Sequence, residues 1–280
     1  MNKIGIIAGN GEFPIEFARA AKQKGLIVVT VAHEEETLPE IAQWSDVVCW
    51  IKVGQLGKII KFFKDQEVRD VLMAGGIKKT RLFSGSLPDL RGAALLARMI
   101  AKKDDSILRA VAEELESEGI TVRESTLYLD NLLAPAGVLT RRRPTKDELR
   151  DIAFGWQMAK EIGRLDIGQT VVVKDLAVLA VEAIEGTDEA IRRGGTLCRE
   201  GAVVVKICKP QQDLRFDLPA TGLRTISIMQ EVRAACLAIE AGKTIMMQKE
   251  ALLARANEAG IAVVALDANG AIPADHRADH

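Results

Sequence analysis

The first part of the chain alternates apolar runs with amphipathic segments, in the order expected of a parallel sheet covered by helices. Residues 3–8 form an apolar run that predicts a buried strand, and Gly9-Asn10-Gly11 predicts a tight turn after it. A helix over 14–24 follows, because Pro14 suits a first helical turn and apolar residues recur at helical spacing. A second strand at 26–31 completes a strand–turn–helix–strand unit, which is typical of a doubly wound α/β sheet.

The same alternation continues to about residue 127. Apolar runs predict strands at 47–51, 70–74 and 120–127, and helical spacing predicts helices at 55–66, 87–102 and 106–118. The composition then changes, because residues 130–144 hold two prolines, a glycine and the triplet Arg141-Arg142-Arg143. We therefore expect an N-terminal domain over 1–130 and a linker over 131–145.

The second half predicts another α/β domain, over 146–270, with a tail at 271–280. Its helices are predicted at 146–162, 187–193, 232–241 and 249–259, and its strands at 170–174, 177–182, 202–208, 225–228, 244–247 and 261–266. The expected fold class is α/β with two domains, an N-terminal Rossmann-like parallel sheet and a C-terminal α/β domain.

Composition and charge exclude several classes of function. The 280 residues carry 38 basic and 39 acidic side chains, so no basic field exists to bind nucleic acid, and aromatic residues make up only 4%. We expect no nucleic-acid partner. Histidine is limited to His33, His276 and His280, which excludes zinc centres and histidine-based triads. Any catalysis must use carboxylates, lysines, arginines, backbone amides or a hard cation.

Several patterns bear on location. The four cysteines form no CxxC pair, the N-terminus lacks the pattern of a signal peptide, and no apolar run approaches 18 residues. We expect a cytoplasmic protein that at most touches a membrane surface. Phe62-Phe63 and Leu82-Phe83 lie beside basic residues and could meet an acyl chain, although a place in the core explains them equally.

Residues 209–222 are the most unusual segment, because charged residues crowd between two prolines and a glycine. In an extended chain Asp213, Arg215 and Asp217 share one face, while Phe216 and Leu218 point the other way. Arginine can neutralise phosphate oxygens, and carboxylates can hold a divalent cation. A surface turn with a local ion pair would give the same pattern.

Two glycine motifs follow predicted strands of the first domain. Gly9-Asn10-Gly11 could bind an anion through backbone amides, but it lacks the third glycine of a dinucleotide fingerprint, so a compact turn without ligand remains open. Gly75-Gly76 ends a buried strand, where parallel sheets open onto ligands. Lys78, Lys79 and Arg81 come next and could face an anion or form a solvated basic loop.

Acidic residues collect at predicted turns and strand ends of the second half. Glu182 ends a predicted strand, and Thr187 and Asp188 begin a helix, where they could cap amides or contact a ligand or metal. The full set is Asp166, Glu182, Glu185, Asp188, Asp213 and Asp217.

Seven blocks of sequence together resemble one family. They are GIIAGNGEFP (5–14), AGGI (74–77), LPDLRG (87–92), KKDDSILRAV (102–111), EIGRLDIGQTVVV (161–173), LAVEAIEGTDEAIRR (179–193) and KPQQDLRFDLPATG (209–222). They resemble the LpxI-type UDP-2,3-diacylglucosamine pyrophosphatases of lipid A biosynthesis, over nearly the whole chain. The last three blocks are the most specific, and departures lie mainly in the linker and after Asp267.

The resemblance implies hydrolysis of UDP-2,3-diacylglucosamine to 2,3-diacylglucosamine 1-phosphate (lipid X) and UMP. It also implies a divalent cation, Mg²⁺ with Mn²⁺ as the alternative. It implies two α/β domains with the ligand crevice between them, a homodimer, and peripheral contact with the inner membrane. Asp217 matches the family's essential acid.

On this interpretation Asp217, Asp213 and Arg215 are predicted to be catalytic, and Asp217, Glu182 and Asp188 to hold the metal. Predicted substrate contacts are Gly9, Asn10, Gly11, Gly75, Gly76, Lys78, Lys209, Asp188, Thr187 and Thr221, with Arg192 as a further phosphate contact. Asp217 could ligate the metal or orient water. An aspartate near its ordinary pKa is a poor general base at neutral pH, which favours a role through the metal.

Three other functions stay open on sequence. A nucleotide-sugar or lipid-phosphate binding module without catalysis explains the glycine turns but not the acids. A NAD(P)-dependent oxidoreductase matches only the first strand–turn–helix. A structural dimerising protein without ligand would need none of these motifs.

Overall fold

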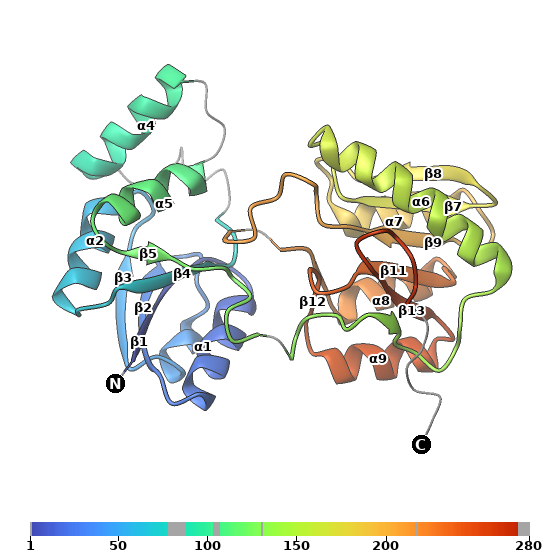
Figure 1. Ribbon diagram of the computed structural model, residues 1–280, viewed down its shortest axis with the longest axis horizontal. Helices are drawn as coiled ribbons and strands as arrows, with labels where there is room; N and C mark the ends of the chain where they lie inside the picture. Colours follow the sequence, from blue (N-terminus) through green and yellow to red (C-terminus); the bar gives the residue numbers. More distant parts are fainter. Residues whose placement is uncertain (1, 78–87, 103–106, 130, 217, 274–280) are drawn as a thin grey trace. The chain divides into compact units, whose positions relative to one another are not determined.

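The computed structural model describes residues 2–77, 88–102, 107–129, 131–216 and 218–273. The chain forms two compact units (Figure 1). Unit 1 contains Met1–Asp130 together with Asp213–Asp217, and unit 2 contains Asn131–Gln212 and Leu218–His280. The chain therefore passes between the units three times, at 130/131, 212/213 and 217/218.

Unit 1 is built on a five-stranded, fully parallel sheet in the order β3-β2-β1-β4-β5. Its strands are β1 (Lys3–Ala8), β2 (Ile27–His33), β3 (Val47–Ile51), β4 (Asp70–Ala74) and β5 (Thr121–Val122). The order reverses between β1 and β4, and this is where doubly wound sheets bind ligands at the carboxyl ends of their strands. The predicted Rossmann-like sheet is confirmed.

The helices of unit 1 are α1 (Phe13–Gln23), η1 (Pro39–Gln43), α2 (Leu56–Asp65), α4 (Leu90–Lys102) and α5 (Ile107–Ser117). Phe63 of α2 and Leu115 of α5 are fully buried in one core with Val71 of β4. The predicted strand at 120–127 shortens to β5, because the chain turns after Arg123 and the peptide of Ser125 bonds to residue 214 instead.

Unit 2 contains a six-stranded mixed sheet in the order β6-β13-β11-β9-β7-β8. Its strands are β6 (Gly137–Val138), β7 (Thr170–Lys174), β8 (Ala177–Val181), β9 (Val203–Lys206), β11 (Cys236–Glu240) and β13 (Ala262–Leu266). Strands β9, β11 and β13 are parallel, β7 is antiparallel to β9 and to β8, and β6 is antiparallel to β13. A separate parallel pair joins β10 (Ala220–Thr221) to β12 (Ile245–Met246).

Helices cover both faces of this sheet. They are α6 (Lys146–Arg164), α7 (Thr187–Thr196), α8 (Leu223–Glu231) and α9 (Lys249–Glu258). Trp156 of α6 packs on one face, while Ile191 of α7 and Leu252 of α9 belong to the core on the other. A capping box starts α6, because Thr145 and Glu148 each bond to the other's backbone N–H.

Two predicted elements in unit 2 are wrong. The predicted helix at 232–241 contains strand β11, and the predicted strand at 225–228 lies inside helix α8. Strand β11 lies between β9 and β13 and is buried on both faces, so it lacks the polar alternation that marks a half-exposed strand. Polar and apolar residues alternate in Thr225-Ile226-Ser227-Ile228 by chance, which imitates a strand, although the segment belongs to a helix that is buried on one side.

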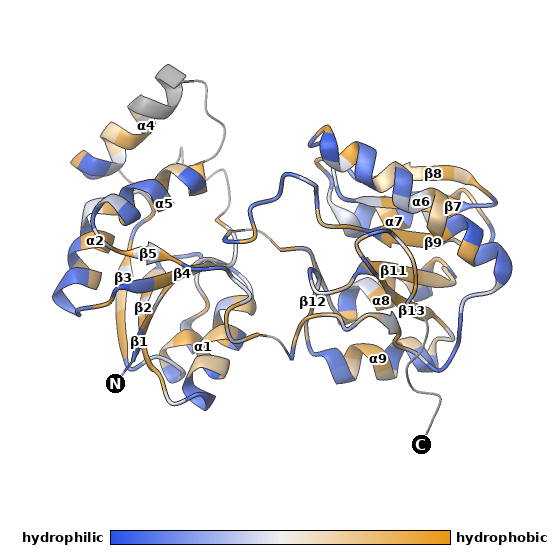
Figure 2. Ribbon diagram, in the orientation of Figure 1, coloured by the Kyte–Doolittle hydropathy of each residue, from blue (hydrophilic) through white to orange (hydrophobic). Residues whose placement is uncertain are grey.

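The hydropathy of the two units follows this layering. Figure 2 shows apolar colour along the sheet strands and polar colour on parts of the surrounding helices. Among the described residues, no helix combines the length and the apolar character that a membrane crossing requires.

Candidate functional site

In unit 1 the two glycine motifs interlock at the carboxyl ends of β1 and β4. The Gly9 N–H donates to Ala74 O at 2.8 Å, and the Asn10 N–H donates to Gly76 O at 2.7 Å. A Cβ on Gly9 would lie 2.3 Å from Gly76 O, and one on Gly75, whose φ is +80°, would lie 2.3 Å from Asn10 O. Only glycine fits such an approach, so the structure brings the two predicted motifs together.

Not every predicted residue of these motifs is part of the contact. A Cβ on Gly11 would have no atom within 4 Å, so its glycine is explained by its φ of +82° alone. Lys78, Lys79 and Arg81 lie outside the described residues. Their predicted role toward an anion stays a prediction.

His33, Thr37 and the acid Glu36 add polar groups to this edge. His33 ends β2, and its Nδ1 lies 2.9 Å from Ala8 O, which also accepts the Thr37 hydroxyl at 2.6 Å. Burial lowers the pKa of His33, and the hydrogen bond to Ala8 only partly opposes that effect. The imidazole is therefore neutral at pH 7 and donates from Nδ1. Asn10 donates to Glu36 Oε2 at 3.1 Å.

Asp213 and Arg215, both predicted to be catalytic, form a bidentate ion pair. Arg215 Nε and an η-nitrogen donate to the two oxygens of Asp213 at 3.0 and 2.8 Å, and the other η-nitrogen donates to Glu116 at 3.1 Å. The hydrogen bonds from Arg215 lower the pKa of Asp213. Both side chains are thus held in place, and their catalytic role stays a prediction.

Contacts inside unit 1 hold the segment that carries this pair. The Ser125 hydroxyl donates to Arg215 O at 2.7 Å, and its N–H donates to Leu214 O at 3.2 Å. Phe216 packs against the hydrophobic core of unit 1. Asp217, the first candidate for the essential acid, lies outside the described residues.

In unit 2 buried charges lie at the carboxyl ends of three strands that run in the same direction, namely β8, β9 and β11. Glu182 follows β8, Lys206 ends β9 and Glu240 ends β11, and their exposed fractions are 8%, 6% and 1%. Charged side chains are rarely buried to this extent unless hydrogen bonds and partners compensate them. This edge is therefore the strongest candidate site in the second unit.

Lys206, Thr187 and Glu182 form a chain of hydrogen bonds at the start of α7. Lys206 Nζ donates to Thr187 Oγ1 at 3.1 Å and to Ala220 O at 2.7 Å. The Thr187 hydroxyl donates onward to Glu182 Oε1 at 3.0 Å. Thr187 is the first residue of α7, whose N-terminal N–H groups have no side-chain cap, so the helix dipole adds positive potential here.

Two oxygen atoms can accept a hydrogen bond from a ligand, one in this chain of hydrogen bonds and one on the residue that follows Ala220. Glu182 Oε2 and Thr221 Oγ1 are buried without a hydrogen-bond partner among the described residues. Buried polar groups normally have a partner, so these atoms mark a place for a bound group. Of the predicted residues, Thr187 bonds to Lys206, Glu182 joins it through Thr187, and Thr221 follows Ala220, whose carbonyl accepts from Lys206. The sequence interpretation missed Lys206 itself.

The remaining predicted residues of unit 2 already have ionic partners. Asp188 pairs with Arg224 at 2.7 Å, Lys209 with Asp166 at 2.7 Å, and Arg192 with acids on α7 and α8. The part of the chain that the structure describes contains no group of three or more metal-ligating side chains. The second oxygen of Glu182 fits a metal ligand, whereas Asp188 is engaged by arginine.

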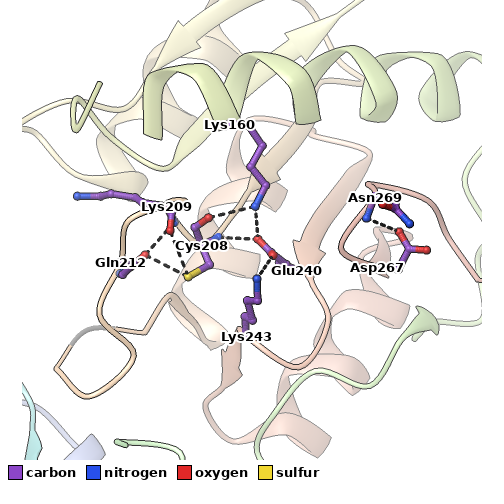
Figure 3. Close-up of polar contacts among 8 residues, drawn as sticks. All are labelled: Lys160, Cys208, Lys209, Gln212, Glu240, Lys243, Asp267 and Asn269. Carbon is purple, nitrogen blue, oxygen red and sulfur yellow. Dashed lines mark hydrogen bonds and ion pairs between the residues drawn. The ribbon is translucent and has the colours of Figure 1, made fainter. Parts of the chain in front are cut away.

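Glu240, which is 1% exposed, is the centre of a second polar cluster (Figure 3). Its Oε2 accepts from Lys160 Nζ at 2.7 Å and from the Cys208 N–H at 3.0 Å, and its Oε1 accepts from Lys243 Nζ at 2.9 Å. Burial alone would raise the pKa of Glu240, but the hydrogen bonds from Lys160 and Lys243 outweigh it and lower the pKa.

A signal for these missed residues exists in the sequence. Lys206 closes the apolar run Val203-Val204-Val205, and Glu240 closes Leu237-Ala238-Ile239. A single charge at the carboxyl end of an apolar strand predicts a place on the ligand edge of a parallel sheet. For Glu240 the wrong helix prediction hid that signal.

Together, two α/β units whose sheets present polar groups at the carboxyl ends of parallel strands define an α/β ligand-binding class. Family models refine this class: the LpxI N-terminal domain matches residues 3–132, and the LpxI C-terminal domain matches residues 135–264. The chain belongs to the LpxI family. The predicted resemblance is confirmed.

A curated relative and solved structures give further comparisons. The chain is 34% identical over 278 residues to UDP-2,3-diacylglucosamine pyrophosphatase LpxI of Caulobacter vibrioides, covering 95% of this chain and 98% of that protein. A biotin carboxylase domain of Hydrogenobacter thermophilus 2-oxoglutarate carboxylase has a TM-score of 0.28 at 16% identity, covering 63% of this chain and 36% of that one. Phosphoribosylglycinamide synthetase from Anaerococcus prevotii has a TM-score of 0.26 at 10% identity, covering 68% and 34%. Neither structural likeness bears on function.

Proposed function

We propose that this chain hydrolyses the pyrophosphate bond of UDP-2,3-diacylglucosamine, releasing 2,3-diacylglucosamine 1-phosphate and UMP, as a step of lipid A biosynthesis. The proposal is supported by family models that match both halves and by a curated pyrophosphatase matched along almost its whole length. The nucleotide-sugar binding module without catalysis is the alternative that the experiments below must exclude.

One structural observation carries the proposal at the level of chemistry, namely the buried chain Lys206–Thr187–Glu182 at the start of α7. Cleavage of a phosphoanhydride places negative charge on phosphoryl oxygens, and preorganised positive groups in a dry site stabilise that charge. Lys206 and the first N–H groups of α7 supply positive potential at one place. Thr221 follows Ala220, whose carbonyl accepts from Lys206, and its buried hydroxyl has no hydrogen-bond partner among the described residues.

The family's essential acid corresponds to Asp217, and we assign it the acidic role at the reacting centre. Mg²⁺ (or Mn²⁺), when bound, would neutralise phosphate oxygens and lower the pKa of a ligated water. Glu182, through its second oxygen, and Asp217 are the residues that would hold it. Asp188 serves instead to orient Arg224, with which it is paired.

In unit 1 we assign substrate contacts to the interlocked turns around Gly9 and Gly75. Their backbone groups lie at the switch point of the sheet, where doubly wound sheets bind ligands, and the two glycines let the turns pack together there. The Asn10 side chain adds an amide that is already oriented by Glu36.

The proposal includes three further properties, of which membrane contact follows from the two acyl chains of the substrate. The enzyme would be cytoplasmic, with peripheral contact at the inner membrane where such a lipid resides. It would act as a homodimer, as the family resemblance implies. Sedimentation and vesicle flotation, each with and without substrate, would test these properties.

The direct test measures release of UMP and lipid X from UDP-2,3-diacylglucosamine in the presence of Mg²⁺. Asp217→Ala should fold and bind substrate but lose turnover, and chelation of the metal should abolish turnover by the wild type. Asp166→Asn removes an exposed acid that pairs with Lys209 and is the matched control. Full activity of Asp217→Ala would refute the assignment, and binding without turnover by the wild type would favour the non-catalytic module.

A further inference from the structure

Three successive acids follow β2 in unit 1, and only the last of them turns inward. Glu34 and Glu35 are exposed, whereas Glu36 is 6% exposed. The N–H groups of Glu36 and Thr37 both donate to His33 O, at 3.2 and 2.9 Å, so the chain turns sharply after the strand. Glu35 has a left-handed φ of +64° in this turn. The turn therefore brings one carboxylate back to the edge of the sheet and leaves two in solvent.

Glu36 reaches the glycine turn that follows the neighbouring strand β1. Its Oε2 accepts from Asn10 Nδ2 at 3.1 Å. On its other side Asn10 donates its backbone N–H to Gly76 O, and a Cβ on Gly76 would lie 3.4 Å from Asn10 Oδ1. Asn10 is thus held between the turn after β2 and the turn after β4, and it orients the carboxylate of Glu36.

A second contact fixes the turn that carries Glu36. The Thr37 hydroxyl donates to Ala8 O at 2.6 Å and accepts from the His33 N–H at 2.9 Å. Because Ala8 ends β1, this hydroxyl ties the turn after β2 to the strand that leads into the glycine turn. Glu36 is therefore preorganised, which lowers the entropy that a side chain loses when it binds a ligand.

The chemistry of Glu36 suits the group that adjoins a phosphate in a nucleotide. The substrate contacts proposed for unit 1 are the glycine turns, and backbone N–H groups in such turns bind phosphate. In UMP the ribose is joined directly to the phosphate, and its hydroxyls are hydrogen-bond donors. A carboxylate accepts through two oxygens with about four lone-pair sites, so the bond from Asn10 does not exhaust it.

The position of Glu36 in the fold points to the same ligand. In doubly wound sheets that bind dinucleotides, an acid about 20 residues beyond the first glycine turn accepts from the ribose 2′-hydroxyl. Glu36 follows the second strand of such a sheet, at a separation of 26 residues from Asn10. Sequence alone offers three acids here, and the structure selects one of them.

We propose that Glu36 binds the ribose 2′-hydroxyl of the UMP half of the substrate, so that unit 1 holds the nucleotide. The inference rests on the proposed function, of which UMP is a product. If Glu36 only kept the glycine turn in shape, its loss would weaken every ligand of that turn equally. A ribose contact instead affects only ligands that carry the 2′-hydroxyl.

The first experiment measures the dissociation constants of UMP and of 2′-deoxyuridine 5′-monophosphate (dUMP) for the full chain by calorimetry. Wild type should bind UMP about 10- to 100-fold more tightly, which is the range for a hydrogen bond to a charged group. Glu36→Gln keeps the shape but removes the charge, so it should weaken UMP about tenfold and dUMP less than about twofold.

Glu34→Gln is the matched control, because it makes the same change two residues earlier on an exposed side chain. It should leave both dissociation constants unchanged. Circular dichroism shows whether the Glu36 variant is folded. The comparison of UMP with dUMP in the wild type tests the proposal even if that variant does not fold.

The second experiment locates the nucleotide by hydrogen exchange and does not depend on activity. Saturating UMP should slow exchange of backbone amides both at residues 9–12 and at residues 33–37. Saturating dUMP should slow exchange at residues 9–12 but leave residues 33–37 near the rate of the free protein, because the contact with the turn after β2 is missing.

The outcomes separate the ribose contact from the proposed function. Equal affinity of the wild type for UMP and dUMP, equal weakening of both in Glu36→Gln, or no protection of residues 33–37 by UMP would overturn the contact. A selective loss of UMP affinity supports it. A chain that releases UMP and lipid X without distinguishing the nucleotides keeps the proposed function and loses the contact. One that distinguishes them without hydrolysis keeps the contact and loses the function.

Discussion

The carboxyl edges of the two sheets occupy the same topological position but consist of different chemical groups. In unit 1 two glycine turns pack backbone against backbone, the buried His33 is neutral, and the buried acid Glu36 accepts from the Asn10 side chain. In unit 2 the same position holds buried charges, with Lys206 hydrogen-bonded to Thr187 and Glu240 to Lys160. Closely packed backbone dominates the edge of unit 1, whereas buried lysine and glutamate side chains dominate the edge of unit 2.

This difference indicates a division of labour for a substrate with a nucleotide, a pyrophosphate and a lipid. Close backbone approach suits recognition of a defined shape, whereas a phosphoanhydride under attack needs preorganised charge. Substitutions in unit 2 should therefore reduce turnover, while substitutions in unit 1 should first reduce stability or affinity.

The largest effect is expected for Lys206→Met, which removes the buried cation of unit 2. Turnover should fall about 10²- to 10³-fold, as it does when one donor to a developing oxyanion is deleted. Steady-state kinetics with the diacylated substrate measure the loss, and circular dichroism checks the fold. Lys174→Met, at the end of β7 on the other edge, is the control. If Lys206→Met retained turnover within threefold of wild type, the positive charge of Lys206 would have no role in the mechanism.

A smaller but still large effect is expected for Gly75→Ala in unit 1. The left-handed φ costs about 1–2 kcal/mol, and the contact with Asn10 O forces a backbone shift that costs about 1–3 kcal/mol more. Gly119→Ala is the matched control, because Gly119 has a φ of +81° and a Cβ added there would meet no atom within 4 Å. Urea unfolding measures the free energy of unfolding of both variants. An equal decrease in Gly75→Ala and Gly119→Ala would show that the contact between the two turns adds nothing to the cost of the left-handed φ.

A moderate effect is expected for Glu182→Gln, which keeps the shape but removes the carboxylate whose second oxygen lacks a partner among the described residues. If this oxygen ligates Mg²⁺, the concentration of Mg²⁺ needed for half-maximal turnover should rise about tenfold. Glu185→Gln changes an acid of the same loop that is paired with Arg193 and should leave the titration unchanged. An unaltered requirement in Glu182→Gln would exclude it as a ligand.

The smallest effect is a pH dependence of stability from His33. Because burial lowers its folded-state pKa below 6.5, both states are neutral above that pH and the full stability is present. As the pH falls below 6.5 the unfolded chain binds a proton that the folded chain does not, so stability decreases, by at most about 1.4 kcal/mol per pH unit. Urea unfolding at pH 7.5, 6.5 and 5.5 should show a shallower decline in His33→Gln. Parallel declines would assign the dependence to other groups.

Local patterns were sufficient for most of the fold. The predicted strands at 47–51, 70–74 and 170–174 match β3, β4 and β7 to the residue, because each is a compact apolar run with clear flanks. The run at 232–241 failed for the opposite reason. An alanine-rich strand buried on both faces has no period of its own, and only its neighbours β9 and β13 determine its state.

The candidate site divides in the same way. The glycine turns of unit 1 could be located from sequence because a glycine pattern states a local backbone requirement. Lys206 and Glu240 could not, because their partners lie 19 and 80 residues away along the chain. Burial of a charge is a property of the assembled sheet, and single-sequence patterns carry only the hint of a charge that ends an apolar strand.

The excursion of residues 213–216 into unit 1 has a consequence for biosynthesis. Phe216 covers part of a core whose other members all lie at or before residue 122, so they are translated much earlier. The Ser125 hydroxyl likewise bonds to the carbonyl of Arg215, which is 90 residues downstream. A nascent N-terminal unit must remain incomplete on the ribosome until most of the second unit has emerged. For the same reason a fragment ending at residue 130 would expose an apolar gap, and splitting the gene at the apparent domain boundary would yield two pieces of which the first needs a peptide from the second.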